Sequence, residues 1–389
     1  MKILLSGYYG YQNVGDDLLL KTLIGELTSI EKVTELNVPV RDIKSVPIGD
    51  SKRVNYIRKA DAKGHKVFNL IRLLTFEFSQ LRKNDVLVYG GGTRLFETSG
   101  RGYYSLLVKF ILLKLNALFL RRKVIHLGVG VGNIYSKKGK WLFKQILLLS
   151  DCMLLRDESS YKLVKSVVGN RRHVLMGSDL IFLSNPLSSV SAARNFNSGT
   201  KRIGLSLFQY YGYISRETSK AEAFKTACQE LISSLLTTNP NVEIYLFSFQ
   251  RQFGGKDQQF NNELHADIAS GRLFHVEYTA DTFAMLSTLR QMDLCIGMRY
   301  HFCLLSLSFD IPTIGINYQP KLLFEFASLG LERFCFEVDE ISQLKGCVEQ
   351  VLSKNDEVNQ VFARASQSLG SRSSRLRKSI CEIYELYFN

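Results

Sequence analysis

Arg299 and His301, in the stretch "GMRYHFCLLSLSF", are two side chains that can bind anions and move protons. Apolar residues flank the pair, and charged groups are rarely buried without a partner. The preceding "DLCIG" is typical of a buried strand, and "YHFCLLSLSF" predicts a helix that starts near Tyr300. Arg299 and His301 would then lie at a helix N-terminus, where backbone N–H groups and the helix dipole attract anions.

Two further cations occupy similar junctions. Lys321, in "GINYQPKLLFE", follows the next predicted strand and begins the next helix. Arg156, in "LLRDESS", ends an apolar strand just before a helix whose first turn carries Asp157 and Glu158. Arg156 can pair with one of these acids, or it can clamp an anion at the strand end, since guanidinium suits planar carboxylates and phosphates. Cations at successive strand-to-helix junctions predict an anion-binding site.

The first junction, "SGYYGYQNVGDDLLL", offers polar side chains at a helix entry, namely Asn13, Asp16 and Asp17. Its glycine spacing matches neither the dinucleotide-binding pattern nor the P-loop pattern. One carboxylate is expected to cap the helix. The other either shares that task or contacts a substrate hydroxyl.

Three glycines follow a predicted strand in "YGGGTRLFE". Gly91, Gly92 and Thr93 would allow the backbone to approach a ligand closely, although a tight turn alone is the alternative. The later stretch "LGVGVGN" fails the dinucleotide pattern because Asn133 occupies the position of the final glycine.

Short apolar runs alternate with helical patterns along the chain, which predicts βαβ units and mostly parallel sheets. The expected class is α/β, with two Rossmann-like domains facing across a cleft and with C-terminal helices. Ligands of such sheets bind outside the carboxyl ends of the strands. The expected divisions are an N-terminal domain at 1–185, a linker at 186–201, a C-terminal domain at 202–365, and a helix at 366–389 that packs back on the first domain.

The chain has 389 residues and the composition of a globular protein, with 46% hydrophobic and 22% charged residues. Its net charge of +14 favours anionic partners such as phosphorylated substrates, a phospholipid surface or nucleic acid. No nucleic-acid-binding motif is present, so we expect no such partner. Seven cysteines without a C-x-x-C pair argue against a disulfide framework and a zinc site. No signal peptide is recognised, which predicts a cytoplasmic protein.

The longest apolar stretch, residues 105–120, is shorter than a membrane span and is followed by "RRK". It is either a buried helix of an α/β domain or a helix that docks on a membrane with Arg121, Arg122 and Lys123 at the headgroups. Residues 66–83 form a second basic and apolar piece. The docking interpretation predicts peripheral attachment to the inner face of the plasma membrane.

Taken together, "GYYGYQNVGDD", "YGGGTRLF", "HLGVGVG", "LLRDESS", "GMRYH" and "INYQPK" resemble the motifs of the polysaccharide pyruvyl transferase family, in the family's order. The resemblance implies a GT-B-like fold and transfer of the enolpyruvyl group of phosphoenolpyruvate to a sugar, which gives a pyruvate ketal. Phosphoenolpyruvate is then a co-substrate, and no cofactor or metal is implied. The family's phosphoenolpyruvate-binding residues correspond here to Arg156, Arg299, His301 and Lys321.

The resemblance also implies roles and partners. His301 is a candidate general acid, Asp16 or Asp17 is expected to orient or deprotonate the acceptor, and Asn13, Gly91, Gly92 and Thr93 are expected to bind it. The acceptor would be a sugar of a cell-surface polysaccharide precursor on a lipid carrier. This chain departs from the family at three positions, which are Val129, Asn133 and Gln319. Two alternatives stay open: a glycosyltransferase of GT-B type that uses a nucleotide sugar, and a non-catalytic sugar- or phosphate-binding protein. The sugar, the hydroxyl pair and the oligomeric state are not indicated by the sequence.

Overall fold

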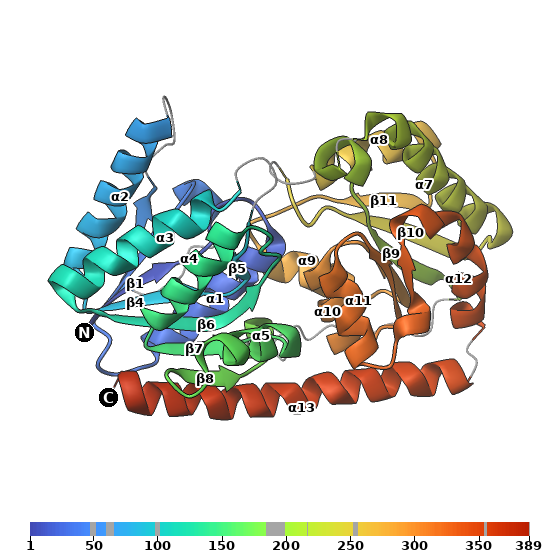
Figure 1. Ribbon diagram of the computed structural model, residues 1–389. Coiled ribbons are helices and arrows are strands. Elements are labelled where there is room, and N and C mark those ends of the chain that lie inside the picture. Colours follow the sequence, from blue (N-terminus) through green and yellow to red (C-terminus); the bar gives the residue numbers. More distant parts are fainter. Residues whose placement is uncertain are drawn as a thin grey trace. The chain divides into compact units, whose positions relative to one another are not determined.

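The computed structural model describes residues 1–46, 52–59, 66–97, 102–183, 199–215, 217–251, 256–353 and 356–388. The chain forms two compact units (Figure 1). The first unit comprises Met1–Tyr11, Asp16–Ser184 and Arg372–Asn389, and the second comprises Gln12–Gly15 and Asn185–Ser371.

The first unit contains a sheet that is 8-stranded within the described residues. Its strands are β1 (Lys2–Ser6), β2 (Glu35–Val40), β3 (Val54–Arg58), β4 (Val86–Gly90), β5 (Thr93–Leu95), β6 (Lys123–Val131), β7 (Cys152–Leu155) and β8 (His173–Met176). The order is β3-β2-β1-β4-β6-β7-β8, with β5 paired to β6, and the pairs are parallel.

Helices connect these parallel strands, as crossover connections require. They are α1 (Val14–Thr28), α2 (Lys66–Arg82), α3 (Tyr104–Leu115), α4 (Lys137–Leu148) and α5 (Glu158–Val168), with short helical turns η1 (Ile43–Ser45), η2 (Asn116–Leu120) and η3 (Leu180–Leu183). Helix α3 packs between α2 and α4 (Figure 1).

The second unit has a 6-stranded parallel sheet within its described residues. Its strands are β9 (Lys201–Ser206), β10 (Val242–Phe247), β11 (Leu273–Val276), β12 (Leu294–Gly297), β13 (Thr313–Asn317) and β14 (Cys335–Glu337), in the order β11-β10-β9-β12-β13-β14. Its helical elements are η4 (Tyr211–Ser215), α7 (Thr218–Thr238), α8 (Asp257–Ile268), α9 (Thr282–Leu289), α10 (Tyr300–Ser308), α11 (Pro320–Ser328), η5 (Glu332–Phe334), η6 (Val338–Gln343), α12 (Leu344–Leu352) and the first part of α13 (Asp356–Tyr387).

The strand order of each sheet reverses once. In the first sheet the reversal lies between β1 and β4, and in the second it lies between β9 and β12. Ligands of open α/β sheets bind outside the carboxyl ends of the strands at such a point. The loops after β1, β4, β9 and β12 are therefore where each unit should carry its functional side chains.

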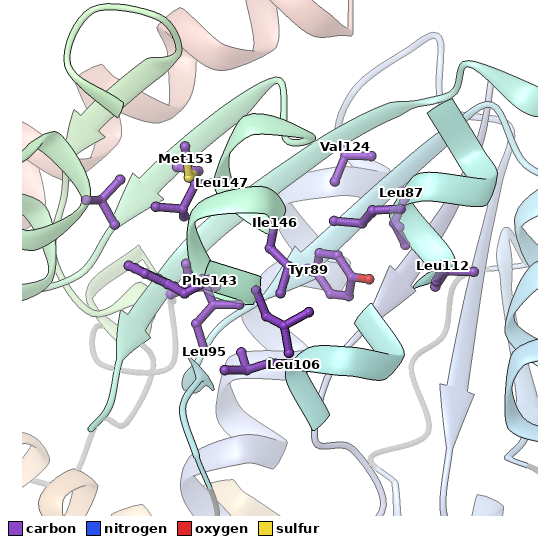
Figure 2. Packing of buried hydrophobic residues seen from close by; sticks show 14 of the residues in the cluster. Leu87, Tyr89, Leu95, Leu106, Leu112, Val124, Phe143, Ile146, Leu147 and Met153 are labelled. Carbon is purple, nitrogen blue, oxygen red and sulfur yellow. The ribbon is translucent and has the colours of Figure 1, made fainter. Parts of the chain in front are cut away.

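A buried hydrophobic cluster lies between the first sheet and helices α3 and α4 (Figure 2). Leu87 and Tyr89 of β4 face Leu106 and Leu112 of α3 there, and Ile146 contributes from α4. Burying apolar surface is worth about 25 cal/mol per Å², so this cluster holds the strand ends in a defined place.

The prediction of an α/β protein with two parallel sheets is confirmed. The predicted helix at 105–120 is an α-helix only to Leu115 and continues as a π-helical turn to Leu120. Most of the predicted linker lies outside the described residues, and β9 already begins at Lys201. A domain boundary was expected at residue 366, but α13 runs through that position as one helix, and only Arg372–Asn389 cluster with the first unit.

The apolar stretch 105–120 contributes to the core through α3, and its large apolar side chains are strongly exposed only at its end, at Leu118 and Phe119. The following basic residues are partly engaged inside the first unit, since Arg122 lies 3.6 Å from Asp85 and Lys123 lies 4.0 Å from Asp151. No helix in the described part of the chain is long and apolar enough to cross a membrane.

Candidate functional site

Arg299 precedes helix α10 in the loop after β12, at the reversal point of the second sheet. Its Nε donates to Asp257 Oδ2 at 3.0 Å, and its Nη2 donates to Asp257 Oδ1. The guanidinium also hydrogen-bonds Tyr318 and stacks on the ring of Phe208 at 4.1 Å from the centroid. The side chain is therefore held in one orientation by contacts with three different segments of the unit.

The Arg299–Asp257 ion pair is buried, because Asp257 has no exposed surface and the Arg299 side chain is 12% exposed. Burial opposes the charge of Arg299, but the carboxylate of Asp257 outweighs it and raises the pKa of the guanidinium further. Burial raises the pKa of Asp257, and the charge of Arg299 works against that shift. Losing either partner would leave an uncompensated buried charge.

His301 lies in the first turn of α10, where the N-terminal end of the helix favours anions. Its ring packs edge-on against Tyr300, with the centroids 5.5 Å apart. It also packs against Gly15, where an added Cβ would lie 1.9 Å from His301 Nδ1. The absence of a side chain at residue 15 is what allows the imidazole to occupy this place.

Lys321 lies in the first turn of α11, which follows β13, the neighbour of β12 in the sheet. Its ammonium group stands over the ring of Tyr300 at 5.2 Å, and the Tyr300 hydroxyl donates to Glu325 Oε2 at 3.1 Å. Tyr300 thus contacts both His301 and Lys321. The two predicted cationic junctions are adjacent within the second unit.

Residues Gln12–Gly15 join the second unit through backbone pairing. Asn13 forms an antiparallel bridge with Gln250, Val14 N donates to Phe249 O at 3.0 Å, and Arg251 N donates to Gln12 O at 3.1 Å. The Asn13 side chain donates to Gln250 Oε1 at 3.3 Å. Asn13 therefore has a structural role in addition to its expected role with the acceptor.

Arg156 lies at the end of β7 in the first unit and is 8% exposed. Its Nη1 donates to the buried Asp179 at 3.3 Å, its Nη2 donates to Thr93 Oγ1 at 2.9 Å, and its Nε lies 3.8 Å from Asp157. The sequence suggested Asp157 or Glu158 as the internal partner. The structure adds Asp179 as the nearer and more buried partner, and it brings Arg156 together with Thr93.

Asp16 and Asp17 lie in the first turn of α1, as predicted, but in different surroundings. Asp17 has no exposed surface, whereas Asp16 is partly exposed. Asp16 Oδ1 would lie 3.7 Å from a Cβ at Gly92, and Gly91 and Gly92 both have positive φ (60° and 70°). A turn with two such residues requires glycine. Of the two acids, Asp16 is the one that a ligand beside this turn can reach.

The sequence alone did not indicate four residues that contact the candidate site, which are Asp179, Asp257, Tyr318 and Gln250. Asp179 follows the short strand β8, which the sequence pattern did not reveal, and its place after a strand end was the available signal. Asp257 begins a polar helix and carries no local pattern that distinguishes it from a capping residue. Its pairing with a residue 42 positions away depends on the fold.

Cys152, His173 and Glu382 in the first unit form a hydrogen-bonded series whose residue types resemble those of a catalytic triad. Cys152 Sγ lies 3.7 Å from His173 Nδ1, and His173 Nε2 lies 2.9 Å from Glu382 Oε1. Burial raises the pKa of the Cys152 thiol to about 12, which disfavours the thiolate that a nucleophilic cysteine requires. Cys152 begins β7 and His173 begins β8, so both lie at the amino edge of the first sheet. Their contacts hold the C-terminal end of α13.

The seven cysteines are free thiols, and the described residues contain no group of three or more potential metal ligands.

Comparison with solved structures identifies the class of fold. The chain resembles a UDP-GlcNAc 2-epimerase from Neisseria meningitidis bound to UDP-GlcNAc, with a TM-score of 0.64, 12% identity, and coverage of 98% of this chain and 100% of that chain. It also resembles HepE from Anabaena in complex with UDP and glucose, with a TM-score of 0.59, 13% identity and 99% coverage of each chain. Two parallel sheets of this kind define a GT-B-like fold.

The family follows from the sequence comparison. Residues 13–320 match the polysaccharide pyruvyl transferase family, and the chain belongs to it. It is also 21% identical to the amylovoran biosynthesis protein AmsJ of Erwinia amylovora over 413 aligned residues, which cover 94% of this chain and 95% of that protein. The chain is accordingly a member of a family of transferases that act in polysaccharide biosynthesis.

Proposed function

We propose that this protein transfers the enolpyruvyl group of phosphoenolpyruvate to a sugar of a lipid-linked precursor of a cell-surface polysaccharide and closes it into a pyruvate ketal. The observation that carries the proposal is the grouping of Arg299, His301 and Lys321 at two adjacent strand-to-helix junctions of the second unit. These residues lie in motifs of a pyruvyl transferase family, and the AmsJ relative is described as an amylovoran biosynthesis protein.

The cations suit the charge of phosphoenolpyruvate, which carries a carboxylate and a phosphate. Asp257 binds the Nε and Nη2 side of Arg299 and so orients the guanidinium, whose planar N–H groups match either anion. Lys321 supplies a compact point charge, and the N-terminus of α10 adds backbone dipoles. Arg156 is a fourth proposed phosphoenolpyruvate-binding residue, and for it the support is its place in the family motif.

The proposed reaction balances as follows. A general acid donates a proton to C3 of phosphoenolpyruvate, and C2 takes on oxocarbenium character. One sugar hydroxyl attacks C2 and loses its proton, after which the C2–O bond to phosphate breaks and phosphate leaves. A second hydroxyl then attacks C2 and loses its proton. Of the two hydroxyl protons, one replaces the proton given to C3 and the other leaves with phosphate.

His301 is the proposed general acid, because an imidazole can donate a proton in catalysis and this one lies at the N-terminus of α10, near the junction that carries Lys321. Asp16 is the proposed group that orients or deprotonates the acceptor, and its buried neighbour Asp17 supports the first turn of α1. Gly91, Gly92 and Thr93 are proposed to approach the acceptor through the turn beside Asp16.

A membrane-facing surface is proposed on α2. Helices of a parallel βαβ unit begin at the carboxyl edge of the sheet and end at the opposite edge. The first turns of α2 expose Val67 (56%), Phe68 (73%) and Ile71 (53%) at that carboxyl edge, beside exposed Arg72. Residues 116–123 lie at the far end of their helix. We therefore assign peripheral attachment to α2 in preference to the stretch 105–123.

The test is phosphate release from phosphoenolpyruvate in the presence of extracted lipid-linked oligosaccharides. The wild-type protein should release phosphate only when the acceptor is present. His301→Ala should abolish release, and Lys321→Met should raise KM for phosphoenolpyruvate, while Lys345→Met, an exposed lysine of α12, serves as the matched control. Consumption of a nucleotide sugar in place of phosphoenolpyruvate, or binding of phosphoenolpyruvate without turnover, would contradict the proposal.

A further inference from the structure

A second group of cations lies at the carboxyl edge of the first sheet and plays no part in the scheme above. Lys59 directly follows β3, Arg94 is the middle residue of β5, and Lys109 projects from α3. The acidic member of the group is Glu77 of α2. We call these four residues the Arg94 cluster. All four side chains are half-buried.

The two lysines are fixed by contacts with the loops at this edge. Lys59 Nζ donates to Gly7 O, in the loop after β1, at 2.7 Å. Lys109 Nζ donates to the carbonyl oxygen of Arg94. The ammonium groups are thereby held beside the reversal point of the sheet rather than extended into solvent.

The charges of the Arg94 cluster act on one another. Burial, assisted by the charge of Arg94, lowers the pKa of Lys59 to about 8 and the pKa of Lys109 well below its usual value. Glu77 opposes both shifts, but no ion pair within the described residues joins it to any of the three cations. Within the Arg94 cluster, three cations face one carboxylate, so the cluster has an excess of cations.

Two buried polar side chains point to a ligand at the same place. Tyr89 is 3% exposed and His126 has no exposed surface, and each feels the charge of Arg94. Tyr89 Oη, His126 Nδ1 and Arg94 Nε are buried and have no hydrogen-bond partner among the described residues. Buried polar atoms are normally paired, at a cost of about 1–3 kcal/mol for each that is not.

A purely structural ion network accounts poorly for this arrangement. Such networks pair buried cations with carboxylates, because an unpaired buried charge is costly. The Arg94 cluster instead concentrates cations at the edge of the sheet where ligands of this fold bind, around Tyr89 Oη and Arg94 Nε, which have no hydrogen-bond partner in the described part of the chain.

We propose that the Arg94 cluster binds a diphosphate group, with Lys59, Arg94 and Lys109 neutralising it and Arg94 Nε and Tyr89 Oη donating hydrogen bonds. That this diphosphate is the one that joins the acceptor sugar to its lipid carrier rests on the proposed function. The binding site itself does not depend on it. An alternative source of the same chemistry is a soluble diphosphate.

Direct binding measurements by calorimetry test the site. Inorganic diphosphate and farnesyl diphosphate, a short prenyl diphosphate, are titrated into the full-length protein. Arg94→Gln and Lys109→Met should each weaken binding by about tenfold or more, because each removes a charge-assisted contact. Lys114→Met is the matched control for Lys109→Met, since Lys114 is exposed at the other end of α3. Glu77→Gln should tighten binding, because it removes the opposing carboxylate.

Tighter binding of farnesyl diphosphate than of inorganic diphosphate, lost in both cation variants, supports the site and the lipid-linked source. Equal binding of the two ligands, also lost in the variants, supports the site and contradicts the lipid-linked source. No binding by the folded wild-type protein, or equal binding by wild type and variants, overturns the proposal. Opposite responses of Glu77→Gln and Arg94→Gln exclude simple misfolding as the cause.

Proton uptake is a second readout. A bound diphosphate favours the protonated forms of Lys59 and Lys109, so binding above neutral pH should take up protons, and affinity should fall as pH rises through about 8. The charged groups that face these lysines are Arg94 of β5, Glu77 of α2, and, around Lys59, Asp16 of α1 and Arg41 after β2. Calorimetry in two buffers of different ionisation enthalpy measures the uptake. Whether pyruvyl transfer occurs does not affect this result.

Discussion

Replacing Gly15 by alanine should disturb His301 directly. The added Cβ would lie 1.9 Å from His301 Nδ1, whereas ordinary contacts begin near 3.4 Å. The imidazole or the start of α1 must then move by about 1.5 Å, and overpacking of a buried position costs about 1–3 kcal/mol. A displacement of about 1 Å at a catalytic group can lower a rate by about a hundredfold.

Hydrogen exchange of the α10 peptides measures the structural effect. A single free energy of unfolding is not defined for a chain with two compact units, and the one tryptophan, Trp141, belongs to the first unit. Gly15→Ala should raise the opening equilibrium of α10 by about 5- to 150-fold, which corresponds to 1–3 kcal/mol. Phosphate release from phosphoenolpyruvate should fall in parallel.

Two comparisons make the test specific. Gly25→Ala, in the same helix but with no atom within 4 Å of the added Cβ, should leave α10 exchange and activity unchanged. In a His301→Ala background, Gly15→Ala should cause little further change in exchange, because the clashing ring is gone. Equal effects of Gly15→Ala with and without His301 would refute the claimed contact, and full activity of Gly15→Ala would refute a catalytic His301.

Three further outcomes follow from buried polar groups. Asp257→Asn should destabilise the second unit by about 3–5 kcal/mol by leaving Arg299 without its counter-charge, and hydrogen exchange should show the double variant with Arg299→Gln to be less destabilised. Burial lowers the pKa of His126 to about 3 in the folded protein. In the unfolded state the ordinary imidazole pKa is near 6.5, so between these two values the unfolded chain binds a proton that the folded protein does not. The first unit should then lose about 1.4 kcal/mol per pH unit as pH falls between these values, a dependence that denaturant titrations should find missing in His126→Gln. Arg156→Lys cannot keep both the Asp179 and the hydroxyl contact, and tryptophan fluorescence should report about 1–3 kcal/mol of destabilisation, whereas an unchanged midpoint would contradict the described geometry.

Much of the fold was predictable because parallel sheets leave a strong pattern. Strands such as "KVIHLGVGV" are buried on both faces and read as continuous apolar runs. Strands β3 and β8 were missed because they are short and partly exposed, and Val174 is the one buried residue in the two strands. Strand order depends on tertiary pairing, so the reversal points that mark the functional edge came from the structure.

The candidate site was predictable where function depends on residue type at a junction. Arg299 and His301 are recognisable in the sequence as polar residues between apolar runs, and the structure places them at the predicted helix start. Their neighbours were not predictable. Asp257 contacts Arg299, and Gly15 contacts His301, only because the fold brings these distant parts of the sequence together. No local sequence pattern indicates either contact.

Label transfer from phosphoenolpyruvate to the glycan is the direct test of pyruvyl transfer by this protein. The protein is incubated with carbon-13-labelled phosphoenolpyruvate and lipid-linked oligosaccharides, and the glycan is released and analysed by mass spectrometry and NMR. We expect a glycan heavier by one labelled carboxyethylidene group, with the labelled C2 in a ketal, and no product from His301→Ala. A glycan without label, or a label-free sugar addition that depends on a nucleotide sugar, would contradict this expectation.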